Sequence, residues 1–335
     1  MKVIIKRALK LLLGEQKATR LFFMTRRGIR NVEITRFIIK VAYYKFIGGG
    51  GGQYSHYKQS DKTDSLTHPP IVISLTSFPA RISYIHHTLY SIFMQDYPYF
   101  SIALFLSVDE FPHKKLPYIL RIFATLNLIK IHFVEGNLRA YKKLFYALRI
   151  YSKHIIITID DDQMYDSQTI SLLINSYKKY PHCIHTHWAY DSDFIMEVLD
   201  IPKAYYMKII KENQPHLALI NVGVSGVLYP PHSFNNEFFN IDNILSLCPH
   251  NDDLWFFVMS VLNDTKKVLV INSLEHPKES AIAIFESPNL WEINVVQNRN
   301  YDQLSALLSA YPQTKEKILH SLKAKQDIKE SSNIK

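Results

Sequence analysis

The chain has 335 residues, about twice the length of an average domain, so we expect one large domain or two modest ones. Hydrophobic residues make up 47% and aromatic residues 13% of the sequence, which suffices for a sizeable core and excludes an intrinsically disordered chain. The only two cysteines, Cys183 and Cys248, exclude a disulfide framework and a CxxC metal site. We expect both to be buried apolar residues of a protein in a reducing compartment.

The formal net charge of +9 is concentrated near the N-terminus. Residues 1–50 contain twelve basic and two acidic residues, a net charge of +10, which leaves −1 for the rest of the chain. Because the rest is close to neutral, the charge does not indicate a nucleic-acid groove there, and we expect no nucleic-acid partner.

Residues 1–47 mix short apolar clusters with a cation every three or four residues. No apolar run reaches the roughly 18–20 residues that a spanning helix needs, and Lys6, Arg7 and Lys10 interrupt any secretory signal. The pattern predicts an amphipathic arm on an anionic membrane surface, which would place the protein at the inner face of the cytoplasmic membrane. The alternative is a helical arm that packs on the body or on a partner chain.

Five consecutive glycines at 48–52 precede a polar stretch that ends in two prolines at 69 and 70. This composition is typical of a flexible linker, and the missing Lys-Ser/Thr ending excludes a phosphate-binding loop of the P-loop type. We therefore predict a linker over 48–70, a folded body over 71–304 and a helical, charged tail over 305–335.

In chain order, the body alternates short apolar runs with segments of helical spacing. The predicted strands are 71–76, 101–108, 131–134, 155–159 and 268–271. The predicted helices are 82–94, 117–128, 139–151, 166–174 and 254–262. This alternation predicts an α/β fold with a mostly parallel sheet flanked by helices. In such folds ligands bind beyond the carboxyl ends of the strands, so residues that directly follow strands are the candidates for function.

Three aspartates, Asp160, Asp161 and Asp162, directly follow the apolar strand 155–159. Their mutual repulsion would be relieved by a divalent cation, and hard oxygen ligands suit Mg²⁺ or Mn²⁺. In an extended chain Asp160 and Asp162 point to the same side, so both can address one metal and a bound diphosphate. The alternative is a solvated acidic turn in which one aspartate caps the next helix.

Several ordered blocks of the sequence resemble bacterial glycosyltransferases of the GT-A type, which build capsule, O-antigen or other lipopolysaccharide and surface polysaccharides. The blocks are ISLTSFPARI (73–82), RAYKKL (139–144), ITIDDDQMY (157–165), GVSGVLYPP (223–231), CPHNDDLWF (248–256) and, more weakly, NYDQL (300–304). The resemblance implies a GT-A-like, Rossmann-type sheet. It also implies a nucleotide-sugar donor such as a UDP-sugar, a divalent metal, and sugar transfer to a hydroxyl of a growing surface glycan, either free or lipid-linked.

The resemblance also implies site residues on the donor side. The donor-binding residues would be Thr76, Arg81, Lys142, Lys143, Asp160 and Asp161. Mn²⁺ or Mg²⁺ would be held by Asp160 and Asp162, with His276 as a further ligand. A guanidinium suits phosphate oxygens, although Arg81 is equally compatible with an ordinary surface cation. A lysine of the 142–143 pair could neutralise the diphosphate leaving group, whereas such pairs usually lie on a solvated helix face.

On the acceptor side, the small residues after position 221 allow close approach of a sugar. The residues implied for sugar or acceptor binding are Gly223, Ser225, Gly226 and Trp255. An acceptor hydroxyl needs a base, for which Asp252 and Asp253 are candidates; we prefer Asp252. One of the two is also expected to cap the following helix. His185 and His187 could line the cleft, but buried and hydrogen-bonded histidines are the commoner case.

Two other functions remain compatible with the sequence. A sugar-phosphate nucleotidyltransferase could use a similar sheet and metal, but it would be expected to have a glycine-rich signature near the first strand, and residues 74–81 contain no glycine. A non-catalytic, membrane-associated partner in a glycan assembly complex would bind neither metal nor nucleotide.

Overall fold

The computed structural model describes residues 28–39, 41, 69–190, 193–209, 213–270 and 299–332. The chain separates into two compact units, Met1–Lys58 and Gln59–Lys335. In the first unit residues 28–39 are helical; the rest of the predicted arm and the glycine run lie outside the described residues. No helix within the described ranges is long and apolar enough to cross a membrane.

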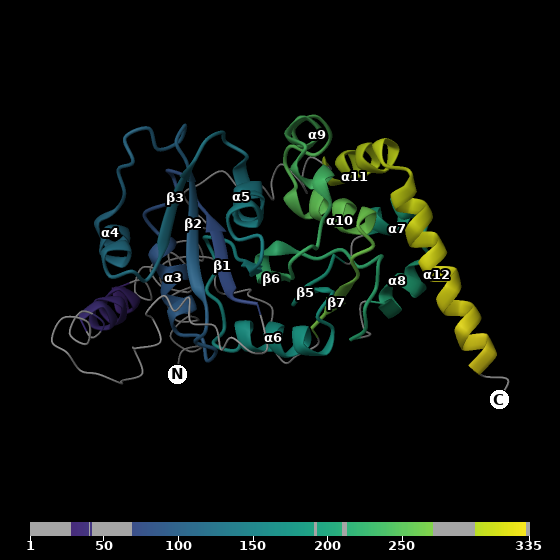
Figure 1. Cartoon of the computed structure of the whole chain (residues 1–335), viewed down its shortest axis with the longest axis horizontal. Helices are drawn as coiled ribbons and strands as arrows, with labels where there is room; N and C mark the ends of the chain where they lie inside the picture. Colours follow the sequence, from purple (N-terminus) through teal and green to yellow (C-terminus); the bar gives the residue numbers. More distant parts are fainter. Residues whose placement is uncertain are drawn as a thin grey trace, which may run out of the picture. The chain divides into compact units, whose positions relative to one another are not determined.

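The second unit contains a mixed seven-stranded sheet in the order β3-β2-β1-β4-β6-β5-β7 (Figure 1). Its strands are β1 (Ile71–Thr76), β2 (Ser101–Ser107), β3 (Lys130–Val134), β4 (Ile155–Thr158), β5 (Ile184–Thr186), β6 (Val227–Tyr229) and β7 (Lys267–Leu269). Neighbouring strands are parallel except where β6 runs antiparallel to both β4 and β5. The sheet confirms the predicted α/β class with a mostly parallel sheet.

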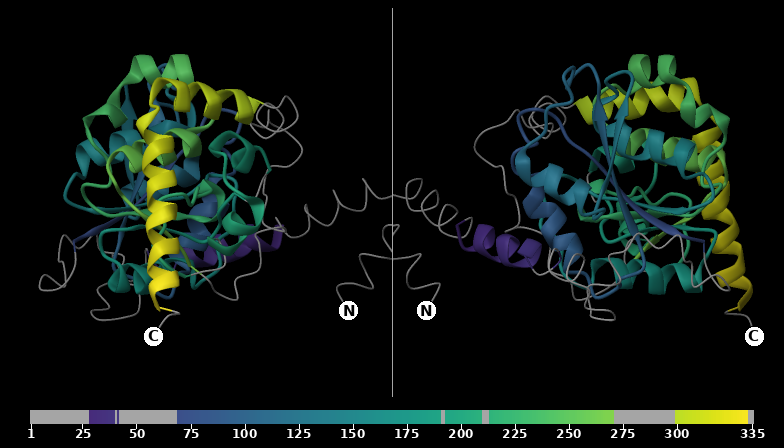
Figure 2. Two further views of the ribbon diagram at one scale, coloured as in Figure 1. Left: turned by 90° about the vertical axis from the view of Figure 1, so that its right-hand side faces the viewer. Right: turned by 60° about the vertical axis from the view of Figure 1, so that its left-hand side comes forward.

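Helices surround this sheet and extend beyond one end of it (Figures 1 and 2). They are α3 (Ile85–Phe93), α4 (Tyr118–Thr125), α5 (Lys142–Ile150), α6 (Thr169–Lys179), α7 (Asp193–Leu199), α8 (Lys203–Ile209), α9 (Ile241–Leu247), α10 (Asp252–Leu262), α11 (Arg299–Ala310) and α12 (Gln313–Ser332). The described part of the unit also contains the 3₁₀ turns η2 (Arg139–Tyr141), η3 (Gly223–Ser225) and η4 (Asn236–Phe239).

The order in which the chain connects the strands determines which face of the sheet each helix covers. From β1 the chain passes through α3 and α4 to β2 and β3, then reverses and crosses back through α5 to β4 on the other side of β1. Because crossovers between parallel strands are right-handed, this reversal puts α5 on the face opposite α3 and α4. Helix α5 packs across β1, β2 and β4.

A continuous hydrophobic core joins α5 to the helices beyond it. Val72 of β1, Phe145 of α5 and Trp255 of α10 belong to the same buried cluster. Helix α10 in turn packs against α11 and α12, drawn in yellow in Figure 2. Burial of these large side chains supplies the main favourable free energy of the fold, and it fixes the N-terminus of α10 relative to α5.

The predicted elements differ from the observed ones mainly at their boundaries. The segment predicted as a helix from 139 begins with the 3₁₀ turn η2, because Arg139 has a positive φ of 51°, which an α-helix does not allow. The helix predicted over 166–174 is α6, which begins at Thr169. Cys183 and Cys248 are free and buried, as expected.

Candidate functional site

The candidate site lies where the strand order reverses, between β1 and β4. These strands are parallel neighbours, with Ser74 opposite Thr158, so the residues that follow them meet at one edge of the sheet. Ser77 and Arg81 come after β1, and the three consecutive aspartates come after β4. Ligand sites of open α/β sheets occur at such reversals.

Asp161 and Asp162 meet partners from the segment after β1. The Ser77 hydroxyl donates to Asp161 Oδ2 at 2.5 Å, and Arg81 Nη1 lies 3.2 Å from Asp161 Oδ1 and 2.7 Å from Asp162 Oδ2. Burial raises the pKa of Asp161 to about 6, against the opposing effect of Arg81. Burial also raises the pKa of Asp162. Arg81 is thus the counter-ion of these two carboxylates rather than an unpaired surface cation.

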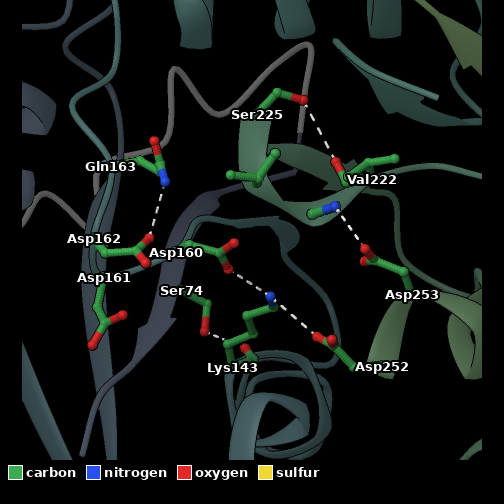
Figure 3. A network of polar contacts seen from close by, with 12 residues as sticks. Ser74, Lys143, Asp160, Asp161, Asp162, Gln163, Val222, Ser225, Asp252 and Asp253 are labelled. Carbon is green, nitrogen blue, oxygen red and sulfur yellow. Dashed lines mark hydrogen bonds and ion pairs between the residues drawn. The ribbon is translucent and has the colours of Figure 1, made fainter. Parts of the chain in front are cut away.

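Asp160 points to a different partner, the ammonium of Lys143 on α5 (Figure 3). Lys143 Nζ lies 2.7 Å from Asp160 Oδ1 and 3.1 Å from Asp252 Oδ2, and its side chain is only 5% exposed. Burial alone would lower the pKa of Lys143, but attraction to Asp160, Asp252 and Asp253 outweighs it and raises this pKa well above its usual value. A charged lysine therefore bridges the end of β4 and the start of α10.

Asp252 and Asp253 occupy the first turn of α10, and neither caps it. The cap is Asn251, whose side chain accepts from the backbone N–H of Leu254, so the expectation of an aspartate cap is wrong. An asparagine at this position satisfies a terminal N–H without using a charge. Both carboxylates are thereby left for other partners.

Asp253 binds the backbone of the glycine-containing turn η3. Its Oδ2 accepts the N–H of Gly223 at 3.0 Å. Burial, followed by repulsion from Asp252, raises the pKa of Asp253 to about 8, although Lys143 opposes the shift. A Cβ on Gly223 would lie 3.0 Å from Asp253 Oδ1 and 3.2 Å from Lys143 Nζ, so a larger residue at this position would crowd both side chains. Gly226, with a φ of 92°, ends the turn.

Tyr165 is a further residue of the site, and the sequence motifs do not predict it. Its hydroxyl accepts the backbone N–H of Asp160 at 2.8 Å and donates to the carbonyl of Val224 at 3.1 Å. Tyr165 thus joins the strand-end aspartates to η3. It belongs to the ITIDDDQMY block, but a single tyrosine at a loop position carries no signal for such a contact.

Other predicted site residues lie away from this cluster or make structural contacts. Lys142 Nζ pairs with Glu110 at 2.5 Å rather than with the aspartates of the site. Thr76 donates to the carbonyl of Phe105, and Ser225 donates to the carbonyl of Val222 at 3.5 Å. Adjacent residues of a helix point in different directions, which separates Lys142 from Lys143.

The side chains of Trp255 and of two histidines, His185 and His187, make hydrogen bonds within the fold. Trp255 is fully buried and donates its Nε1–H to the carbonyl of Phe238, so the prediction that it contacts an acceptor is wrong. His185, also fully buried, contacts Ser176 and the carbonyl of Tyr180, and His187 contacts the carbonyl of Thr169. Both histidines are therefore hydrogen-bonded in the structure, His185 as a buried residue and His187 as a half-buried one. His276 lies outside the described residues.

The charges of the cluster bear on whether it suits a divalent cation. Five aspartates (Asp160, Asp161, Asp162, Asp252 and Asp253) gather around two cations, Arg81 and Lys143. Within the described part of the chain, no three His, Cys, Asp or Glu side chains form a ready-made metal-binding group. The excess of negative charge and the carboxylate oxygens nevertheless fit a hard cation such as Mg²⁺ or Mn²⁺ on Asp160 and Asp162.

No protein-family model and no curated protein matches the sequence. Among solved structures, the chain is similar to the mannosyltransferase PcManGT from Pyrobaculum calidifontis in complex with GDP-Man and Mn²⁺, with 12% identity, a TM-score of 0.40 and coverage of 90% of this chain and 85% of that one. It is similar to Mycobacterium tuberculosis glucosyl-3-phosphoglycerate synthase in complex with Mn²⁺, UDP and glucosyl-3-phosphoglycerate, with 12% identity, a TM-score of 0.39 and coverage of 72% and 79%.

The chain is also similar to S. aureus TarS 1–349, with 12% identity and a TM-score of 0.37. The similarity covers 59% of this chain and only 57% of the TarS structure. Identities this low do not transfer a substrate from those proteins to this chain.

Proposed function

We propose that this protein is a glycosyltransferase that moves a sugar from a nucleotide-diphosphate donor, such as a UDP-sugar, to a hydroxyl of a bacterial surface glycan. The observation that carries the proposal is the Lys143 bridge between Asp160 and Asp252 at the strand-order reversal. It brings a donor-side acidic cluster next to the two carboxylates from which a base for the acceptor can be drawn. Transfer requires both functions in the same place.

On the donor side, Asp160 and Asp162 would hold Mn²⁺ or Mg²⁺. Such a cation, when bound, neutralises the negative charge that develops on a diphosphate leaving group. Arg81, beside Asp162 at 2.7 Å, has a planar set of donors suited to phosphate oxygens. The chain's own part is therefore to hold the diphosphate against the end of β4.

On the acceptor side, Asp252 and Asp253 have different surroundings. Asp253 has its pKa raised to about 8 by burial and by Asp252, and it is engaged by the Gly223 N–H. A carboxyl that is mostly protonated at neutral pH is a poor proton acceptor. We therefore assign Asp252 the role of base towards the acceptor hydroxyl, and Asp253 the role of holding η3, where Gly223, Ser225 and Gly226 would contact the sugar.

Three finer assignments belong to the same proposal. The folded body would begin after the linker 48–70, the acceptor would be a growing capsule or lipopolysaccharide glycan, and the basic arm 1–47 would hold the protein at the anionic inner membrane surface. Cations and apolar clusters in one segment act together on such a surface. Deletion of residues 1–50 should then release the protein from anionic vesicles, and undiminished vesicle binding would refute this assignment.

The decisive experiment is thermal unfolding of the full chain with UDP, GDP or CMP, each with and without Mn²⁺. A ligand at about one hundred times its Kd stabilises the native state by about 2.7 kcal/mol. We expect one nucleotide to raise the Tm in the presence of Mn²⁺, and Asp162→Ala to lose that shift. If none of the nucleotides shifts the Tm, the non-catalytic partner becomes the better interpretation.

A further inference from the structure

Tyr165 lies in the loop between β4 and α6, and its backbone is anchored to α3. Its N–H donates to the Ser91 hydroxyl at 3.1 Å, and the tyrosine side chain is largely buried. The loop therefore presents the Tyr165 hydroxyl from a fixed backbone position. Residues held in this way have little freedom to reorient without moving their partners.

Chemistry fixes the direction of the two hydrogen bonds that this hydroxyl makes. The N–H of Asp160 can only donate, and the carbonyl of Val224 can only accept. The Tyr165 hydroxyl must therefore accept from Asp160 and give its one proton to Val224. Burial and, to a smaller extent, the negative charge of Asp160 raise the pKa of Tyr165 well above its usual value, so the proton stays on the Tyr165 hydroxyl.

We propose that Tyr165 is a positioning residue that fixes the strand-end aspartate Asp160 relative to the turn η3. The inference rests on the proposed function, in which Asp160 belongs to the nucleotide subsite and η3 to the sugar subsite. The Tyr165 hydroxyl then sets the spacing between these two subsites. A nucleotide sugar must fill both at once, so this spacing determines how well it binds.

The other contacts of η3 support this assignment. Asp253 holds the N–H of Gly223 from the side of α10, and the N–H of Gly226 closes the turn on the carbonyl of Gly223. Tyr165 holds the carbonyl of Val224 from the side of β4. The turn is thus held between the two elements that carry the site's carboxylates, and Tyr165 provides the link to the donor-side element.

Removing the hydroxyl should disturb the site more than the fold. In Tyr165→Phe the ring still fills its place, but the Asp160 N–H and the Val224 carbonyl lose their common partner. Buried backbone groups without partners are costly, so the loop or the turn shifts to find other partners. A shift of this kind alters the spacing between Asp160 and Gly223 while the sheet stays intact.

The test compares Tyr165→Phe with Tyr311→Phe in the full chain. Tyr311 is a matched control, since it is also largely buried, donates to Glu237 Oε1 at 2.6 Å and accepts from Asn243 at 2.8 Å. The ligand is the nucleotide found by the thermal screen, titrated calorimetrically with Mn²⁺. We expect both variants to lose a few degrees of Tm, but only Tyr165→Phe to bind the nucleotide about tenfold more weakly, the effect of about one hydrogen bond.

Equal nucleotide affinity in Tyr165→Phe and the wild type would overturn the assignment, since a merely structural tyrosine would behave like Tyr311. If the wild type binds none of the nucleotides, the proposed function fails separately. Hydrogen exchange then decides about Tyr165: the Asp160 amide should exchange at least tenfold faster in Tyr165→Phe than in the wild type and Tyr311→Phe. Unchanged exchange at Asp160 would refute the positioning role.

Discussion

Lys143 Nζ lies 2.7 Å from Oδ1 of Asp160. Helix α5, which precedes β4 in the chain, therefore supplies the counter-ion for an aspartate that follows β4. The same ammonium also reaches Asp252. A buried cation shared between carboxylates of two elements holds these elements together as long as all partners are present.

Replacement of Lys143 by methionine should therefore strongly destabilise the protein. Asp160, Asp252 and Asp253 would lose their cation inside a buried site, and breaking such a pair costs about 3–5 kcal/mol. Chemical denaturation measures the loss. Lys142→Met is the matched control: Lys142 is equally buried but pairs with the partly exposed Glu110, so a smaller loss is expected. Equal losses in the two variants would contradict the bridging role of Lys143.

Gly223→Ala should destabilise the protein by crowding the side chains of Asp253 and Lys143. The added Cβ would lie 3.0 Å from Asp253 Oδ1 and 3.2 Å from Lys143 Nζ, and overpacking of this kind costs about 1–3 kcal/mol. Gly28→Ala is the control, because nothing lies within 4 Å of its Cβ position. Thermal unfolding that shows the same Tm for both variants would argue against the tight packing of η3.

The raised pKa of Asp253 predicts a pH dependence of stability. Burial and repulsion from Asp252 raise this pKa from 3.8 to about 8 in the folded state, while Lys143, the Gly223 N–H and Asp160 also face the group. The folded state then holds a proton that the unfolded state has lost between pH 4 and 8. The contribution of Asp253 to the free energy of unfolding is therefore greatest below pH 4, and it decreases as the pH rises towards 8.

Asp253→Asn should remove this decline. The amide oxygen can still accept the Gly223 N–H, but it carries no charge at any pH. Denaturation between pH 5 and 8.5 should show a flatter profile for the variant, with the largest gain over the wild type at the alkaline end. Parallel profiles would show that Asp253 does not hold a proton in the native state.

The variant Trp255→Phe should show whether Trp255 acts as a core residue or as a ligand-binding residue. Trp255 is fully buried and bonded to the carbonyl of Phe238, so the smaller ring leaves a void and an unpaired carbonyl, at a cost of about 1–3 kcal/mol. Nucleotide affinity, measured by calorimetry below the Tm of the variant, should stay unchanged. A loss of affinity without a loss of stability would restore Trp255 to the site.

Local patterns in the sequence were enough to predict some parts of this protein. The mostly apolar run 71–76 predicted β1, since such runs are buried in parallel sheets. The run 155–159 predicted β4 and therefore placed the aspartates at a strand end, where α/β proteins bind ligands. These predictions depend on a few consecutive residues, and nothing distant was needed to make them.

Only the tertiary structure decided which of these residues meet. Lys143 and Lys142 are adjacent lysines, but the helix directs one to Asp160 and the other to Glu110. Tyr165, absent from the sequence-based prediction, contacts Val224 because β4 and β6 pair as neighbours. Asp252 joins the site because core packing fixes α10 beside α5. Contacts between residues far apart in the chain depend on the packing of whole elements, which no local pattern encodes.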